Sequence, residues 1–126
     1  MPIGHAFLPL PLMLLLVGGC KPPPDERQFM PVADVAAGKE AIERVGCASC
    51  HSIGGIDWPK GKAGPPLEGF ARRALIAGRV PNRPELLARF VRNAPAVAPG
   101  TTMPAMPLSE EESRDVAAYL YQIGGQ

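Results

Sequence analysis

The folds open to this 126-residue chain are limited above all by one short run, Cys47-Ala48-Ser49-Cys50-His51. Two thiols three positions apart can each add to a vinyl group of haem, and the histidine that follows can then bind the iron. A zinc site usually needs four ligands, and no second Cys or His pair follows in the chain. A redox dithiol belongs beside a βαβ pattern, which the sequence lacks. The run therefore predicts one covalent haem c, with thioethers at Cys47 and Cys50 and an iron ligand at His51.

The third cysteine, Cys20, ends an apolar N-terminal segment. Residues 1–19 contain no Lys, Arg, Asp or Glu, and a Leu-rich run extends from Ala6 to Val17. This run is shorter than the roughly 20 residues that a membrane-spanning helix needs, and it is typical of a signal peptide. The small residues before Cys20 resemble the cleavage site of bacterial lipoproteins. We expect a lipoprotein-type signal peptide and lipidation of Cys20, with an ordinary cleaved signal or an uncleaved anchor as alternatives.

Export and haem attachment support each other, because covalent attachment of this kind takes place outside the cytoplasm. We therefore expect a location on the periplasmic side of a bacterial membrane, held there by acyl chains. Residues 20–32 include Pro22-Pro23-Pro24 and little apolar surface, which predicts an extended tether. Residues 33–126 then form one small domain. A core of that size is marginal on its own, and a covalent haem would supply much of the missing apolar core.

The domain is predicted to be all-α, with three main helices and loops wrapped around one haem. Asp34 is a candidate N-cap for a helix that runs to about Val45, and Pro84 opens a second helix that runs to about Asn93. Ser109 and Glu112 form a capping box for a third helix, which stops at Gly124-Gly125. A short helical turn is expected near residues 70–77. Period-two alternation is absent, and 16 prolines make extended sheet unfavourable.

The order of these features resembles that of the class I cytochromes c, which carry a single haem. The resemblance covers nearly the whole domain: a helix, C-x-x-C-H, a Gly-Pro-x-Leu segment at residues 64–67, a middle helix, Met-Pro and a terminal helix. It implies close packing of the first and last helices, with Gly38 against the aromatic Tyr119. It also implies that His51 donates its free ring N–H to the carbonyl of Pro65, which fixes the ring beside the iron.

Two methionines compete for the sixth iron position, Met103 and Met106. Core filling is the ordinary use of methionine, since its flexible thioether packs into irregular gaps. The resemblance places the ligand six residues before the residue that caps the last helix, which is Ser109. It therefore implies Met103 as the ligand and Met106 as the alternative. With both axial positions filled by protein, the iron would exchange one electron and bind no substrate, so we expect an electron carrier rather than an enzyme.

Charge is distributed unevenly along the chain. Residues 60–92 hold eight basic residues against two acidic ones, whereas the formal net charge of the whole chain is +1. Arg72, Arg73 and Asn82 are candidates for contacts with the haem propionates. The other basic side chains could form a face that steers encounter with an acidic docking site. Nucleic-acid binding is not expected, because the domain is not strongly basic and has few aromatic residues.

Residues 72–104 are similar to the cytochrome c domain fused to subunit II of some bacterial haem–copper oxidases. In that subgroup an aromatic residue near the position of Phe90 packs on the haem. The resemblance implies redox protein partners such as a terminal oxidase or a quinol-oxidising complex, served by a monomeric, membrane-tethered carrier in a respiratory chain. The alternatives are a fixed electron-transfer subunit of a dehydrogenase or oxidase complex, and a haem enzyme or gas sensor with a labile Met ligand.

Overall fold

The computed structural model describes Met1 and residues 29–123. Its three long helices begin where the sequence predicts, at or directly after Asp34, Pro84 and Ser109. Helix α1 (Val35–Val45) follows Asp34, whose side chain accepts hydrogen bonds from the first turn. Helix α2 (Pro84–Arg92) opens with proline. Helix α4 (Glu110–Ile123) follows Ser109, whose N–H donates to the Glu112 carboxylate at 2.7 Å while the Glu112 N–H donates to the Ser109 hydroxyl at 3.1 Å. The predicted capping box is therefore confirmed.

Helices α1 and α4 cross in close contact, as predicted, and the atoms nearest to Gly38 belong to the backbone of α4. A Cβ added at Gly38 would lie 2.0 Å from the backbone oxygen of Asp115, so the two helix backbones touch there. The Asp115 side chain accepts from the N–H of Asp34 at 2.8 Å, which fixes the start of α1 on α4. Tyr119, one turn further along α4, donates its hydroxyl to the Gly54 carbonyl at 2.8 Å. The close approach of the α4 backbone is what requires a glycine at position 38.

A small hairpin replaces most of the helical turn expected near residues 70–77. Only Phe70–Arg72 forms a turn of 3₁₀ helix, called η2. Strand β1 (Leu75–Ile76) then pairs antiparallel with β2 (Val80–Pro81). Strands of two residues are too short to produce a period-two pattern, which is why the sequence gives no sign of them. The short helix α3 (Ala94–Val97), held by the Asn93 side chain, was missed for the same reason.

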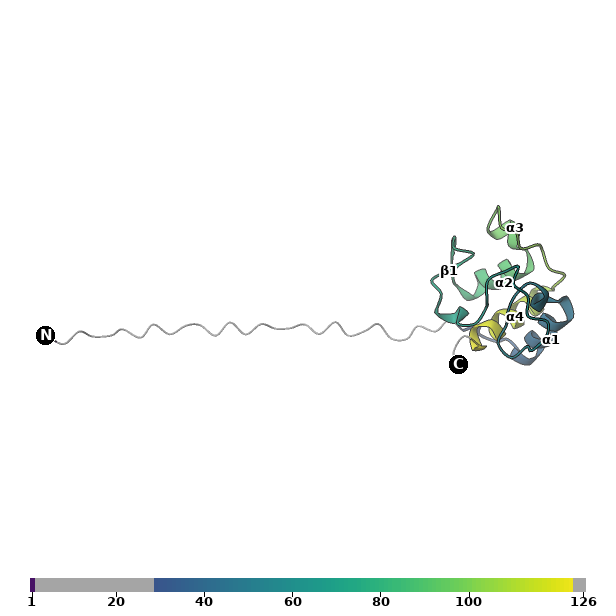
Figure 1. Ribbon diagram of the computed structural model, residues 1–126, viewed down its shortest axis with the longest axis horizontal. Helices are drawn as coiled ribbons and strands as arrows, with labels where there is room; N and C mark the ends of the chain where they lie inside the picture. Colours follow the sequence, from purple (N-terminus) through teal and green to yellow (C-terminus); the bar gives the residue numbers. More distant parts are fainter. Residues whose placement is uncertain (2–28, 124–126) are drawn as a thin grey trace.

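The three long helices and their loops enclose one hydrophobic core. Figure 1 shows α1 and α4 together on one side of the domain, with α3 and the β1–β2 hairpin toward the other. Met30 is 7% exposed and joins this core, so packing begins before residue 33, where the sequence places the end of the tether. The expected signal peptide, Cys20 and the stop at Gly124-Gly125 lie outside the described residues. Within residues 29–123, no helix is long and apolar enough to cross a bilayer.

Candidate functional site

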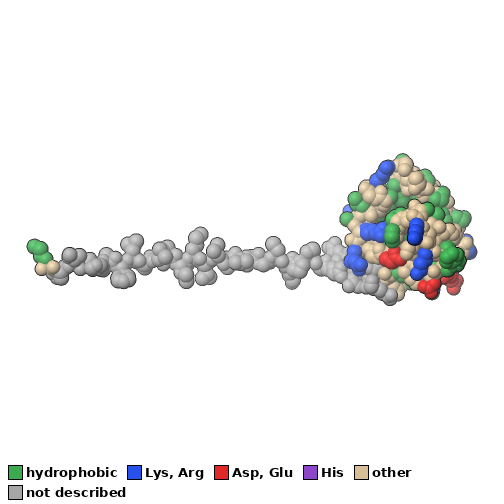
Figure 2. Space-filling view, viewed as in Figure 1, with side chains coloured by type: hydrophobic (Ala, Val, Ile, Leu, Met, Phe, Trp, Pro, Cys, Tyr) green, Lys and Arg blue, Asp and Glu red, His purple; other side chains and the backbone are tan. Residues whose placement is uncertain are grey.

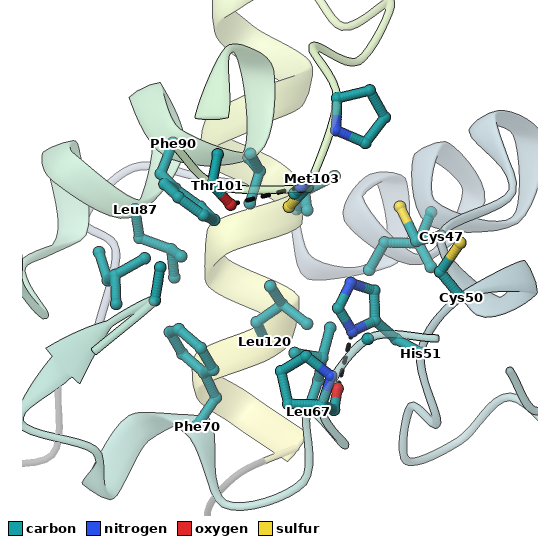
Figure 3. Close-up of a pocket in the computed structure, with 18 of the residues that line it drawn as sticks. Cys47, Cys50, His51, Leu67, Phe70, Leu87, Phe90, Thr101, Met103 and Leu120 are labelled. Atoms are coloured by element: carbon teal, nitrogen blue, oxygen red, sulfur yellow. Dashed lines mark hydrogen bonds between the residues drawn. The ribbon is translucent and has the colours of Figure 1, made fainter. Parts of the chain in front are cut away.

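A cavity of about 470 Å³ opens between the helices and two long loops (Figure 3). Its walls are mainly apolar side chains from α1, α2, α4 and η2, and they include Ile42, Phe70, Leu87, Phe90, Val116 and Leu120. Cavities that hold cofactors usually measure about 300–1,000 Å³ and combine such walls with a few polar groups. Its size and lining therefore suit a bulky, largely apolar ligand.

The residues of the C-x-x-C-H run reach this cavity together. Gly46 ends α1 in a left-handed conformation (φ 79°), and the chain then turns through η1 (Cys47–Ser49). Cys47, Cys50 and His51 all line the cavity, and the two cysteines form no disulfide with each other. Burial raises the pKa of the Cys47 thiol. The structure thus brings the predicted attachment thiols and the predicted ligand to one wall.

The ring of His51 is fixed by a carbonyl on one side and a glycine on the other. Its Nδ1 lies 2.7 Å from the carbonyl oxygen of Pro65, which is the contact that the resemblance to class I cytochromes c implies (Figure 3). Because Nδ1 is engaged there, Nε2 is the nitrogen left to bind a metal. A Cβ at Gly64 would lie 2.3 Å from the ring carbon Cε1, so no larger residue fits at that position with the ring in place.

A ladder of backbone hydrogen bonds fixes the loop that carries Pro65. Residues 61, 64 and 67 donate to the carbonyl oxygens of residues 48, 50 and 52, each at 2.8 Å. The Ser52 hydroxyl adds a bond of 2.7 Å to the Glu68 carboxylate, and this bond is the main reason that the pKa of Glu68 lies below its usual range. Neither Ser52 nor Glu68 was singled out from the sequence. A pair of ordinary polar residues sixteen positions apart carries no motif that could reveal it.

The two candidate methionines have different environments. Met103 lines the cavity, and its N–H donates to the Thr101 hydroxyl at 3.3 Å. Met106 does not line the cavity; its N–H donates to the Arg92 carbonyl at 2.9 Å and so attaches this loop to the end of α2. Figure 3 shows the Met103 sulfur and the His51 ring approaching the cavity from different sides. Met103 is therefore the methionine positioned to meet a group bound opposite His51.

Only some of the other residues predicted to contact the haem lie on the cavity. Phe90 and Arg73 line the cavity, whereas Arg72 and Asn82 do not. Asn82 is 4% exposed, and its amide donates to the carbonyls of Phe70 and Arg73 at 2.9 Å each. Its own carbonyl accepts from the Tyr121 hydroxyl at 2.8 Å. The expected propionate contact of Asn82 is thus replaced by a buried structural role, because all its side-chain atoms are engaged inside the protein.

The donor set of this cavity fits a covalently bound haem. Two thiols and an imidazole occupy one wall, a thioether occupies another, and apolar side chains lie between them. When bound, haem c supplies an iron that exchanges one electron between Fe(II) and Fe(III). Cys47 and Cys50 would hold the porphyrin edge, and His51 would bind the iron. The apolar side chains of α2 and α4 would exclude water from the remaining surface.

Comparison with known proteins gives the same assignment. A family model described as cytochrome c matches residues 35–124. The chain is also 36% identical over 87 residues to a curated protein named cytochrome c oxidase subunit 2, from Alkalihalophilus pseudofirmus. The matched stretch is 68% of this chain but 25% of the relative, so the chain spans about a quarter of that protein's length.

These matches confirm the predicted helical cytochrome c fold and the covalent haem c with its iron. The family match also supports a haem protein of electron transfer. The chain belongs to the cytochrome c family, as a class I member with one haem that is related to the oxidase subunit.

Proposed function

We propose that this chain is a membrane-tethered carrier that passes single electrons to a terminal oxidase, with His51 and Met103 as the two axial ligands of its iron. The observation that carries the proposal is that both side chains line one apolar cavity from different loops, whereas Met106 does not reach it. A soft thioether favours ferrous iron and so raises the reduction potential. With both axial positions filled by the protein, substrates and gases have no open site on the iron.

A spectrum tests the ligands. The holoprotein is recorded oxidised and reduced, with and without carbon monoxide. We expect low-spin haem c, a weak red absorption band from Met sulfur bound to Fe(III), and no change with carbon monoxide. A high-spin spectrum, or one that shifts with carbon monoxide, would show an open iron and support an enzyme or gas sensor instead.

The choice of partner rests on similarity and on charge. The matched relative is named as an oxidase subunit, and a separate chain of this kind could deliver electrons to such an enzyme. Lys60 and Lys62 are exposed on a loop that is bonded to the attachment turn through Gly61 and Ala48. Figure 2 shows Lys and Arg side chains spread over the visible face, with acidic side chains at its lower edge and among the basic ones. These positive charges favour an acidic docking site close to the exposed Cys50.

The partner is tested by the rate at which a purified haem–copper oxidase oxidises the reduced protein at increasing ionic strength. We expect the rate constant to fall with salt, and to fall further when Lys60 and Lys62 are both changed to Glu. Lys39→Glu on α1 reverses one charge elsewhere, and it is the matched control for Lys60→Glu alone. Rates that neither salt nor the loop charges affect, together with co-purification in high salt, would indicate a fixed subunit of a larger complex.

The tether is tested at Cys20. Cys20→Ser removes the thiol that would carry the lipid, so the holoprotein should become soluble or remain unprocessed. The readouts are membrane fractionation and the mass of the mature protein. A wild-type mass without acyl chains, with the Ser variant just as firmly bound to membranes, would contradict the lipid anchor.

A further inference from the structure

The carbonyl that holds His51 belongs to a segment that cannot stabilise itself. Pro65 and Pro66 have no backbone N–H, so neither residue can donate to its neighbours. Both are exposed at the surface. The nearest backbone bonds lie at Gly64 on one side and Leu67 on the other. The direction of the Pro65 carbonyl therefore depends on donors supplied from elsewhere in the fold.

Arg73 supplies such donors. Its Nη2 donates to the carbonyl of Pro66 and, at 3.3 Å, to the carbonyl of Glu68. The guanidinium carbon lies 5.2 Å from the centre of the Phe70 ring, a distance at which a cation is attracted to the ring. Arg73 also lines the cavity. One side chain thus connects the aromatic wall of the cavity to the residue that follows Pro65.

The backbone of Arg73 is held in turn from inside the protein. Its carbonyl accepts from the Asn82 amide at 2.9 Å, and Asn82 accepts from the hydroxyl of Tyr121 on α4 at 2.8 Å. Asn82 and Tyr121 are 4% exposed each, so the bond between them is shielded from competing water, and the bond from Asn82 to Arg73 is partly buried. Burial also raises the pKa of Tyr121 well above its usual range, which keeps its hydroxyl a donor. A continuous polar connection therefore runs from α4 to the Pro66 carbonyl.

We propose that Arg73, held by Asn82 and Tyr121, is a positioning residue that keeps the Pro65 carbonyl on the ring of His51 and thereby sets the donor strength of this ligand. The inference rests on the proposed function, because it takes His51 as an iron ligand. A hydrogen bond from Nδ1–H to a carbonyl makes the imidazole more basic, and a more basic ligand stabilises Fe(III). Loosening the carbonyl should therefore raise the reduction potential.

Arg73→Lys is the informative change. Lysine keeps the positive charge, but a single ammonium group cannot hold two carbonyls and lie on the Phe70 ring in the same way. We expect a higher reduction potential, an upfield shift of the His51 Nδ1–H signal in the reduced protein, and about tenfold faster exchange of that proton with solvent. Arg73→Met tests the effect of the charge. Removing a positive charge near the iron lowers the reduction potential, whereas loosening the Pro65 carbonyl raises it.

Tyr121→Phe tests the same connection from its buried end. If Arg73→Lys yields no holoprotein, Tyr121→Phe is the variant that tests whether this connection positions the Pro65 carbonyl. It should move the Nδ1–H signal and the potential in the same directions by smaller amounts. Tyr119→Phe is the matched control: it removes a hydroxyl two residues earlier on α4, and that hydroxyl contacts Gly54 rather than Asn82. We expect it to leave both quantities unchanged.

The outcomes separate this inference from the function on which it rests. An unshifted Nδ1–H signal and an unchanged potential in Arg73→Lys, with a lower potential in Arg73→Met, would mean that Arg73 acts through its charge alone. A variant that loses stability but keeps both quantities would have a purely structural role. Either result overturns the inference while leaving His51 as a ligand. A wild-type protein in which His51 does not bind the iron would overturn both.

Discussion

Gly38 and Asp115 bring two helix backbones into contact: a Cβ on Gly38 would lie 2.0 Å from the Asp115 oxygen. The side chain of Asp115 meanwhile accepts from the Asp34 N–H, so α4 fixes both the start of α1 and its closest approach. The two attachment cysteines lie on the turn that follows α1, directly after Gly46.

Gly38→Ala should therefore destabilise the holoprotein strongly. The added methyl group meets backbone rather than a movable side chain, so the helices must separate, at a cost of about 3 kcal/mol in the free energy of unfolding. Gly54→Ala is the matched control, because a Cβ there meets its nearest neighbour at 3.7 Å, an ordinary contact distance. Chemical denaturation of both variants gives the comparison. Equal stabilities would show that the helices can move apart without penalty.

Met103→Ala should leave the haem attached but open the sixth iron position. The cysteine thioethers do not depend on the axial ligand, so the absorbance of haem c should remain after denaturing electrophoresis. The spectrum should become high-spin and respond to carbon monoxide, and the potential should fall. Met106→Ala is the control, and we expect it to keep the wild-type spectrum with some loss of stability. The reverse pattern would identify Met106 as the ligand.

Glu112 should make the stability of the protein depend on pH in the acid range. The Ser109 N–H and hydroxyl, helped by Arg44, hold the pKa of Glu112 below its usual range in the folded protein. The unfolded chain therefore binds the proton more tightly. The stabilisation of the folded protein by ionised Glu112 is complete above the unfolded pKa of about 4.3. It is lost as pH falls through the folded pKa. Thermal melts of wild type and Glu112→Gln should differ at pH 7 and converge near pH 3.

The neighbouring residue provides the control for that measurement. Glu111→Gln makes the same chemical change in the same first turn of α4. It should follow the wild-type curve more closely than Glu112→Gln does at pH 7. If both variants lose the same stability, the effect comes from the general attraction of acidic groups to a helix start and not from the capping box.

Tyr119→Phe should cost about 1 kcal/mol of stability, the usual net contribution of one hydrogen bond. Its hydroxyl donates to the Gly54 carbonyl and so attaches α4 to the loop that follows His51. Denaturant unfolding measures the loss. A phenylalanine variant as stable as wild type would indicate that water takes over the Gly54 carbonyl at little cost.

The sequence predicts the elements whose ends carry strong local signals. Asp34, Pro84 and the Ser109–Glu112 pair each mark a helix start within one residue of its observed position. The hairpin and α3 escape such analysis because two or four residues cannot show a period. The Asn82 N–H donates to the Ala74 carbonyl and so extends the hairpin by one pair, and Asn93, next to α3, pairs with Ala105 from the following loop.

The residues of the site also fall into two groups, those that belong to a sequence motif and those that do not. Cys47, Cys50, His51 and Met103 belong to motifs, and the structure places all four on the cavity. The role of Asn82 could not be read from the sequence, because its partners lie at residues 70, 73 and 121 and meet only in the folded chain. Pairing at such distances depends on the fold as a whole, which local pattern does not specify.

The backbone hydrogen bonds between residues 48–52 and 61–67 limit where the sequence of this protein can change without disturbing His51. Ile56 is buried and Gly61 is bonded to Ala48, so both ends of the short stretch between them are anchored. Trp58, within that stretch, is 85% exposed. Substitutions or insertions there would alter the outer surface beside the attachment turn without moving His51. Selection could therefore change what this surface recognises while the redox properties of the iron stay constant.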